Sequence, residues 1–123
     1  MEVLLDTNFI ISCIVKKIDF LSQLREKGFR VVIPREVMQE LKDVRLHSKT
    51  SSEERKAIDI ALQMLASKQI EKTTIGKGKV DDALIKKGQQ GAYIATLDNG
   101  IKRSVPNRVV ILSASKEVGI ERD

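Results

Sequence analysis

The side chains of this 123-residue chain that are best suited to chemistry are carboxylates that stand next to apolar segments. They lie in four separated parts of the sequence: Asp6, Glu40, Asp81 with Asp82, and Asp98. Asp6 interrupts the apolar run LLDTNFII, where an unpaired charge is costly to bury. Each aspartate on its own is typical of a helix N-cap, whose side chain accepts a hydrogen bond from a free backbone N–H group. Only their combination indicates a further role.

Carboxylates that gather in one place repel one another, and each raises the pKa of its neighbours unless a cation neutralises them. Their oxygen atoms are suitable ligands for Mg²⁺ or Mn²⁺, and the set lacks the cysteine and histidine ligands typical of zinc. Such an ion can activate water and stabilise charge on a phosphoryl group, and two ions about 4 Å apart can hold both the attacking and the leaving oxygen. The pattern therefore indicates hydrolysis of phosphodiester bonds.

The elements that must position these carboxylates alternate between strand and helix patterns. Runs of apolar and β-branched residues predict strands over residues 2–5, 29–34, 70–75, 92–96 and 108–112. Continuous apolar runs of this kind are typical of a parallel sheet that is covered by helices on both faces. We therefore expect an α/β fold with a central parallel sheet of four or five strands. In such sheets, sites lie beyond the carboxyl ends of the strands.

Apolar residues at three- and four-residue spacing predict helices between these strands. Ser51 and Glu54 have the spacing of a capping box at the start of one helix. A shorter helix is predicted from Val80 to Lys87, with Gly88 as its end. The last eleven residues, 113–123, have a weak pattern, and no element is assigned to them.

Composition and charge narrow the class of protein. The length and 41% hydrophobic content fit one domain over residues 1–123, and a net charge of +5 favours a polyanionic partner. Aromatic residues make up 3% of the chain, so a platform of stacked aromatic side chains for RNA is not expected. The single Cys13 and an apolar start too short to span a bilayer predict a cytoplasmic protein without a membrane partner.

Four short motifs resemble those of the PIN-domain nucleases. The first is VLLDTNFII, an apolar strand that ends in Asp-Thr-Asn, and the second is PREVMQEL, which contains Glu40. The third is VDDALI, in which Asp82 has the family's spacing to the isoleucine and Asp81 is a close second. The fourth is ATLDNGIK, with a hydroxyl residue two positions before Asp98. The resemblance covers residues 3 to 112, and four motifs in this order are far more specific than any one of them.

The resemblance implies a PIN fold, which is a three-layer sandwich, and a metal-dependent site that cuts single-stranded RNA. The catalytic acids would be Asp6, Glu40, Asp82 and Asp98. These acids, with Asp81 as a further candidate ligand, would hold one or two Mg²⁺ or Mn²⁺ ions. Asn8 and Thr96 would orient the carboxylates and the attacking water.

Basic residues near the third and fourth motifs are candidates for contacts with RNA phosphates. They are Lys77, Lys79, Lys86, Lys87, Lys102 and Arg103. The only histidine, His47, lies in a polar segment and is expected to have a structural role or none.

The family contains branches with different biology, and the sequence leaves two of them open. One is the toxin of a VapBC-type toxin–antitoxin pair, whose partner is a cognate antitoxin; the other processes ribosomal RNA precursors, and the DTNFII and DDALI forms favour it. A homodimer is common in the family.

The alternative function is a non-catalytic RNA- or protein-binding module. Receivers and dehalogenase-like phosphatases also place an Asp after the first strand, but they need further acids that this chain lacks.

Overall fold

Strands and helices alternate along the chain, and the computed structural model describes every residue from 1 to 123. The strands are β1 (Glu2–Leu5), β2 (Arg30–Pro34), β3 (Glu71–Thr73), β4 (Tyr93–Ala95), β5 (Asn107–Leu112) and β6 (Glu117–Arg122). The helices are α1 (Thr7–Val15), α2 (Phe20–Glu26), α3 (Arg35–Leu46), α4 (Ser52–Leu65), α5 (Val80–Gln89) and α6 (Asn99–Ser104). The predicted α/β class is therefore confirmed.

All six strands belong to one sheet, in the order β3-β2-β1-β4-β5-β6. The first five strands run parallel, and β6 pairs antiparallel with β5 at the edge. From β1 the chain moves outward to β2 and β3, and it then returns to β4 on the other side of β1. The strand order thus reverses between β1 and β4, and ligands of open α/β sheets bind beyond the carboxyl ends of the strands at such a point.

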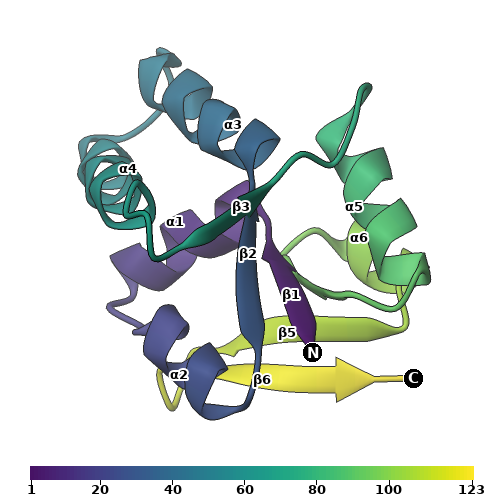
Figure 1. The fold of residues 1–123 in the computed structure, drawn as a ribbon. Helices are drawn as coiled ribbons and strands as arrows, with labels where there is room; N and C mark the ends of the chain where they lie inside the picture. The colour runs from purple at the N-terminus through teal and green to yellow at the C-terminus, as the bar shows by residue number, and fades with distance from the viewer.

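The sheet is the middle layer of a three-layer sandwich, with α1 to α4 on one face and α5 and α6 on the other (Figure 1). Side chains of β1 alternate between the faces: Val3 and Leu5 join a cluster of 24 buried residues, whereas Leu4 joins a cluster of five. The small cluster consists of Leu4, Leu84, Ile94, Ile101 and Val105. Because both faces of the strands are covered, their sequences are continuously apolar.

The structure corrects the predicted end of α5. Gly88 lies inside this helix, which continues to Gln89, and Gly91 makes the turn with a φ of 109°. Gly88 is buried, and a Cβ there would lie 2.3 Å from Cγ1 of Val105. The glycine therefore allows α5 to pack closely on the segment before β5, and it does not end the helix.

Two further findings concern the helices and the last residues. The capping box is confirmed: Ser51 Oγ accepts a hydrogen bond from Glu54 N, and the Glu54 side chain accepts one from Ser51 N. Residues 117–122, to which no element was assigned, form β6. None of the helices has the length and apolar character that crossing a bilayer requires.

Candidate metal and active site

Asp6 lies between the end of β1 and the start of α1, at the point where the strand order reverses. It is only 6% exposed, and its backbone N–H donates to Ala95 O of β4. Its Oδ1 accepts a hydrogen bond of 2.8 Å from Thr7 N, and its Oδ2 accepts one of 2.8 Å from Thr96 Oγ1. Asp6 therefore caps α1, yet each carboxylate oxygen keeps a further lone pair with which it can contact a cation.

The surroundings of Asp6 disfavour its charged form. Burial raises its pKa, the hydrogen bonds from Thr96 and Thr7 lower it, and the nearby carboxylates Glu40 and Asp81 raise it again. The balance leaves the pKa above its ordinary value. No Lys or Arg forms an ion pair with Asp6 in the structure, so nothing in the protein neutralises this charge.

Glu40 comes from α3 and reaches Asp6 through a threonine. The hydroxyl of Thr7, the first residue of α1, donates a hydrogen bond to Glu40 Oε1. Thr7 is 4% exposed, and Glu40 is half-buried. Thr7 is the middle residue of the Asp-Thr-Asn motif, but the sequence pattern alone indicates no role for its side chain. Thr7 links the helices α1 and α3 at the site.

Thr96 directly follows β4 and connects two of the acids. Its side chain is fully buried, and its hydroxyl donates to Asp6 Oδ2 while accepting a hydrogen bond of 3.0 Å from Asp98 N. Asp98 caps α6, because its Oδ1 accepts a hydrogen bond of 2.8 Å from Ile101 N. The remaining oxygen of Asp98 is free to point toward solvent, and the residue is exposed.

The first turn of α5 brings one of its two aspartates to the site. Asp81 lines the same pocket as Asp6 and Asp98, whereas Asp82 does not. Successive residues of a helix point about 100° apart, so only one of two neighbours can face a given pocket. The sequence spacing to Ile85 made Asp82 the first candidate for the catalytic acid, with Asp81 as the alternative. Of the two, Asp81 is the one that lines the pocket.

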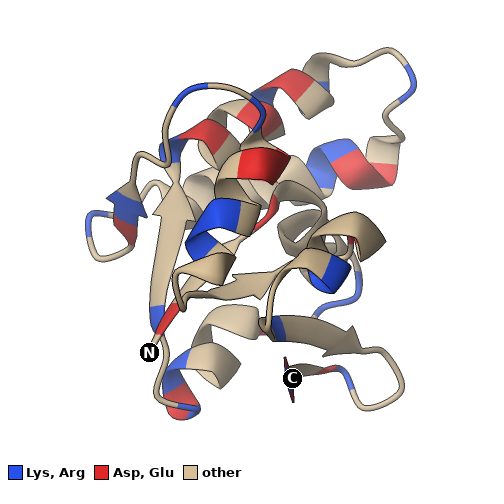
Figure 2. Cartoon of the chain, turned by 90° about the vertical axis from the view of Figure 1, so that its right-hand side faces the viewer, with Lys and Arg blue, Asp and Glu red and all other residues tan.

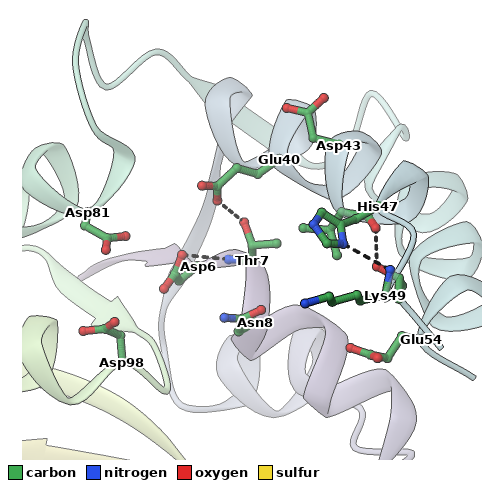
Figure 3. A pocket seen from close by; sticks show the side chains of 12 residues that line it. Asp6, Thr7, Asn8, Glu40, Asp43, His47, Lys49, Glu54, Asp81 and Asp98 are labelled. Atoms are coloured by element: carbon green, nitrogen blue, oxygen red, sulfur yellow. Dashed lines mark hydrogen bonds between the residues drawn. The ribbon is translucent and has the colours of Figure 1, made fainter.

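These residues line one pocket of about 570 Å³ beyond the ends of β1 and β4 (Figure 3). Its lining residues are Asp6, Thr7, Asn8, Glu40, Asp43, Val44, His47, Lys49, Thr50, Glu54, Asp81 and Asp98. Asn8 is on the wall, but it makes no hydrogen bond to a carboxylate. Among the two residues expected to orient the acids, therefore, Thr96 contacts one and Asn8 does not.

The pocket is strongly acidic, and its acids are left unpaired by the protein. Six carboxylates line it, and none of them takes part in an ion pair. The acids that do form ion pairs all lie elsewhere: Glu2, Asp59, Glu71, Glu121 and Asp123. Neutralisation must therefore come from an external cation or from protonation.

The donor set fits a hard divalent cation, since it offers oxygen atoms only. No three side chains of Asp, Glu, His or Cys stand close enough together to enclose an ion as they are arranged. This spacing is compatible with Mg²⁺, which usually keeps several waters and takes one or two protein carboxylates. A site of that kind is more open than a structural metal site.

The basic residues named from the sequence lie outside the pocket, on the face of the molecule that carries α5 and α6 (Figure 2). Lys77 and Lys79 are exposed in the loop before α5, and Lys86 and Lys87 follow in that helix. Lys102 and Arg103 of α6 line a separate hollow. None of the six forms an ion pair, so their charges are available to an anionic ligand.

Comparisons with known proteins agree with this architecture. A family model described as a PIN like domain matches residues 3–114. Among solved structures, that of the PIN domain endonuclease Utp24 is similar, with a TM-score of 0.77 and 23% identity over 99% of this chain and 92% of that chain. At that identity the likeness establishes the fold. A comparison with curated proteins gave no match. The family match confirms the resemblance seen in the four motifs, and the chain belongs to the PIN-like domain family.

Proposed function

We propose that this protein is an endoribonuclease that uses Mg²⁺ or Mn²⁺ to hydrolyse phosphodiester bonds of single-stranded RNA. One observation carries the proposal: carboxylates from four separate parts of the chain meet in one pocket, and the protein pairs none of them with a cation. Such a pocket repels RNA on its own, and it attracts divalent cations that in turn attract a phosphate.

Asp6, Glu40, Asp81 and Asp98 are the residues that would hold the ion or ions, with Asp82 as an alternative to its neighbour. A bound ion of this kind supplies an activated water and stabilises charge on the phosphoryl group.

The chain's own contribution is to hold the carboxylates in place. Thr7 fixes the orientation of Glu40, and Thr96 ties Asp6 to the backbone that carries Asp98. Removal of such supporting contacts typically lowers metal affinity or activity 10- to 100-fold.

The exposed lysines and arginine around α5 and α6 would guide the RNA by contacts with its phosphates. Contacts of this type weaken as salt rises and do not discriminate between sequences.

The endonuclease activity that is stated for the structurally similar Utp24 supports cutting within a strand. The protein then serves either as the toxin of a VapBC-type pair or in ribosomal RNA processing. A homodimer, a cognate antitoxin and a ribosomal precursor remain predicted partners, and neighbouring genes would separate the two roles.

A non-catalytic RNA- or protein-binding module is the second candidate. One observation favours it: no three potential ligands are close enough to enclose an ion without movement. In that case the acidic pocket would bind ions weakly, and the molecule would bind RNA without cutting it.

The two candidates are separated by cleavage of end-labelled single-stranded RNA with Mg²⁺, Mn²⁺ or a chelator. Asp6→Asn and Asp98→Asn should each lower the rate by more than about 100-fold, because loss of a ligand exceeds the loss of a supporting contact. Glu53→Gln serves as the control, since Glu53 is exposed on α4 and lies outside the pocket.

Equal cleavage by the wild type and both aspartate variants would refute the site assignment. No cleavage by the wild type, together with no metal binding by calorimetry, would favour the binding module.

A further inference from the structure

The pocket continues past the candidate metal ligands toward the loop between α3 and α4. At this second end its wall includes Asn8, His47, Lys49 and Thr50 (Figure 3). A Mg²⁺ ion with six waters needs about 180 Å³, at about 30 Å³ per water. Most of the pocket's 570 Å³ therefore remains for another group, and this second end is where that group would lie.

Lys49 is the only Lys or Arg that lines the pocket. It is exposed and forms no ion pair, and Figure 3 shows its side chain extended toward Asn8. The two acids nearest this end have other partners: Asp43 Oδ1 accepts from Gln39 Nε2, and Glu54 accepts from the N-cap of α4. The ammonium group is therefore available to an incoming anion.

The backbone around Lys49 is held in place although its side chain is exposed. Lys49 N donates a hydrogen bond of 3.2 Å to His47 Nδ1, and Thr50 N donates one of 3.1 Å to His47 O. Arg55 of α4 donates a further hydrogen bond of 3.2 Å to His47 O. His47 thus positions the loop that presents Lys49.

Asn8 completes this end of the pocket from α1. It is exposed, and neither the nitrogen nor the oxygen of its amide takes part in a hydrogen bond within the protein. Its NH₂ group can donate two hydrogen bonds, and the ammonium of Lys49 can donate three. A cation and an amide donor are typical partners of nucleic acid phosphates. The phosphate would lie on the side of the pocket where Lys49 supplies its only positive side chain.

We propose that Lys49 and Asn8 bind a backbone phosphate of the RNA that neighbours the phosphate to be cut. The proposal rests on the proposed nuclease function, and it adds a subsite that fixes the RNA relative to the metal ligands. The subsite adds one positive side chain, beside the metal ions, to a pocket that is otherwise lined by six carboxylates. It also gives Asn8 a role that does not require contact with a carboxylate.

The test measures binding of a labelled ten-nucleotide oligouridylate in the cleavage-impaired Asp98→Asn background, with Mn²⁺, over a range of salt concentrations. Lys49→Ala should weaken binding about fivefold and reduce the slope of log K against log salt by about 0.7, the value for one phosphate contact on a single strand. Lys49→Arg should keep most of the affinity. Lys68→Ala is the matched control, since Lys68 is an exposed lysine near the opposite end of α4.

Unchanged affinity and salt slope in Lys49→Ala would overturn the subsite. So would a loss of Mn²⁺ affinity by calorimetry in that variant, since Lys49 would then act on the metal ligands. The dinucleotide UpU has a single phosphate, so wild type and Lys49→Ala should cleave it at equal rates. If Lys49→Ala lowered the rate of UpU cleavage as much as it lowers the affinity for the longer strand, Lys49 would contact the scissile phosphate and the proposed subsite would be wrong. If the wild type binds RNA without cutting it, the proposed nuclease function is wrong. The effect of Lys49→Ala on RNA affinity would still show whether Lys49 binds a phosphate.

Discussion

The two halves of the candidate site are built differently. The half formed by β1, α1 and α3 contains Asp6 and Thr7, which are buried, and it rests on the cluster of 24 buried residues. The half formed by α5 and α6 contains Asp81 and Asp98, which are exposed, and it rests on the cluster of five. The first half is therefore held in position before any ligand binds, whereas the second is more open to adjustment.

This difference accounts for the spacing of the acids. Burial raises the pKa of Asp6, and the neighbouring carboxylates raise it further, so the buried half carries a charge that the protein alone does not favour. The exposed acids keep their contact with water, and leaving them apart avoids further repulsion. A divalent ion would replace this repulsion between carboxylates with attraction, because it attracts the acids of both halves. We therefore expect metal binding to stabilise the fold, because a ligand that binds only the folded state shifts the equilibrium toward it.

Among the residues that support the acids, the largest effect is expected where the two halves meet, at Thr96. Thr96→Val keeps the shape of the side chain but removes the hydroxyl, which leaves Asp6 Oδ2 without its donor and Asp98 N without its acceptor. Cleavage and metal affinity should fall up to about 100-fold. The free energy of unfolding should fall by about 1 to 3 kcal/mol, the cost of buried groups left unpaired. RNA cleavage, Mn²⁺ calorimetry and urea unfolding measure the three quantities.

Thr73→Val provides the control for this change. Thr73 lies on β3, away from the pocket, and its hydroxyl makes no hydrogen bond. If Thr96→Val behaved like Thr73→Val, the hydroxyl would not couple the two halves.

The second prediction concerns the packing under the exposed half. In Gly88→Ala the new Cβ would lie 2.3 Å from Val105 Cγ1 and 2.8 Å from Val105 Cβ, so α5 or the segment before β5 must shift. Overpacking costs about 1 to 3 kcal/mol, and the better helix propensity of alanine returns up to about 1 kcal/mol. A net loss of about 1 to 2 kcal/mol in the free energy of unfolding is expected from urea titration.

The double variant Gly88→Ala/Val105→Ala tests the cause of that loss. If the clash with Val105 is responsible, the double variant should lose less stability than the sum of the two single variants, because contacting residues couple. Strict additivity would place the cost elsewhere.

The third prediction separates the two neighbouring aspartates of α5. Asp81→Asn should lower cleavage about 5- to 10-fold, because Asp81 faces the pocket and its charge acts on Asp6. This loss is smaller than for Asp6→Asn, since Mg²⁺ takes only one or two carboxylates directly and the exposed Asp81 would act on the ion through a bound water. Asp82→Asn should leave the rate within about twofold of the wild type, since surface charges away from a site contribute little. Both residues are exposed in the same first turn, so each serves as the control for the other. The reverse order of effects would restore the assignment that the sequence spacing favoured.

The sequence predicted the layers of this fold and the presence of Asp6 and Thr96 beside the ends of strands, because apolar periodicity and strand ends are local signals. It did not predict that Thr7 would contact Glu40. That contact joins residues 33 positions apart and depends on how α1 packs against α3. The choice between Asp81 and Asp82 depends on the rotation of α5 about its axis, which a one-residue error in the helix start changes by about 100°.

Two further differences have the same physical origin. Gly88 has the sequence signal of a helix end, but a glycine required for close packing carries an identical signal. Strand β6 lies at the sheet edge with most of its residues at least partly exposed, so its pattern is weak, and its pairing with β5 supplies the order. Local pattern therefore identified the elements, and contacts between distant elements determined the details of the site.

The smallest predicted effect concerns the loop that carries Lys77 and Lys79. Glu36, in the first turn of α3, accepts hydrogen bonds of 3.2 Å from Ile75 N and Gly76 N and so anchors the start of this loop. Burial raises the pKa of Glu36, but backbone N–H groups, including those of Ile75 and Gly76, lower it more, and the pKa lies below its ordinary value. The stabilisation is therefore complete above the pKa of the unfolded chain and is lost as pH falls through the lower, folded pKa.

Glu36→Gln should consequently weaken RNA binding only about twofold near neutral pH, because Glu36 lies outside the pocket and acts only through the loop that carries Lys77 and Lys79. Hydrogen exchange at the amides of Ile75 and Gly76 should become faster in this variant, while Glu53→Gln, which changes an exposed glutamate of α4, should leave it unaltered. The difference in stability between the wild type and Glu36→Gln should shrink as the pH is lowered below about 4, because both then carry an uncharged side chain. A difference that stayed constant over this range would show that the charge of Glu36 does not anchor the loop.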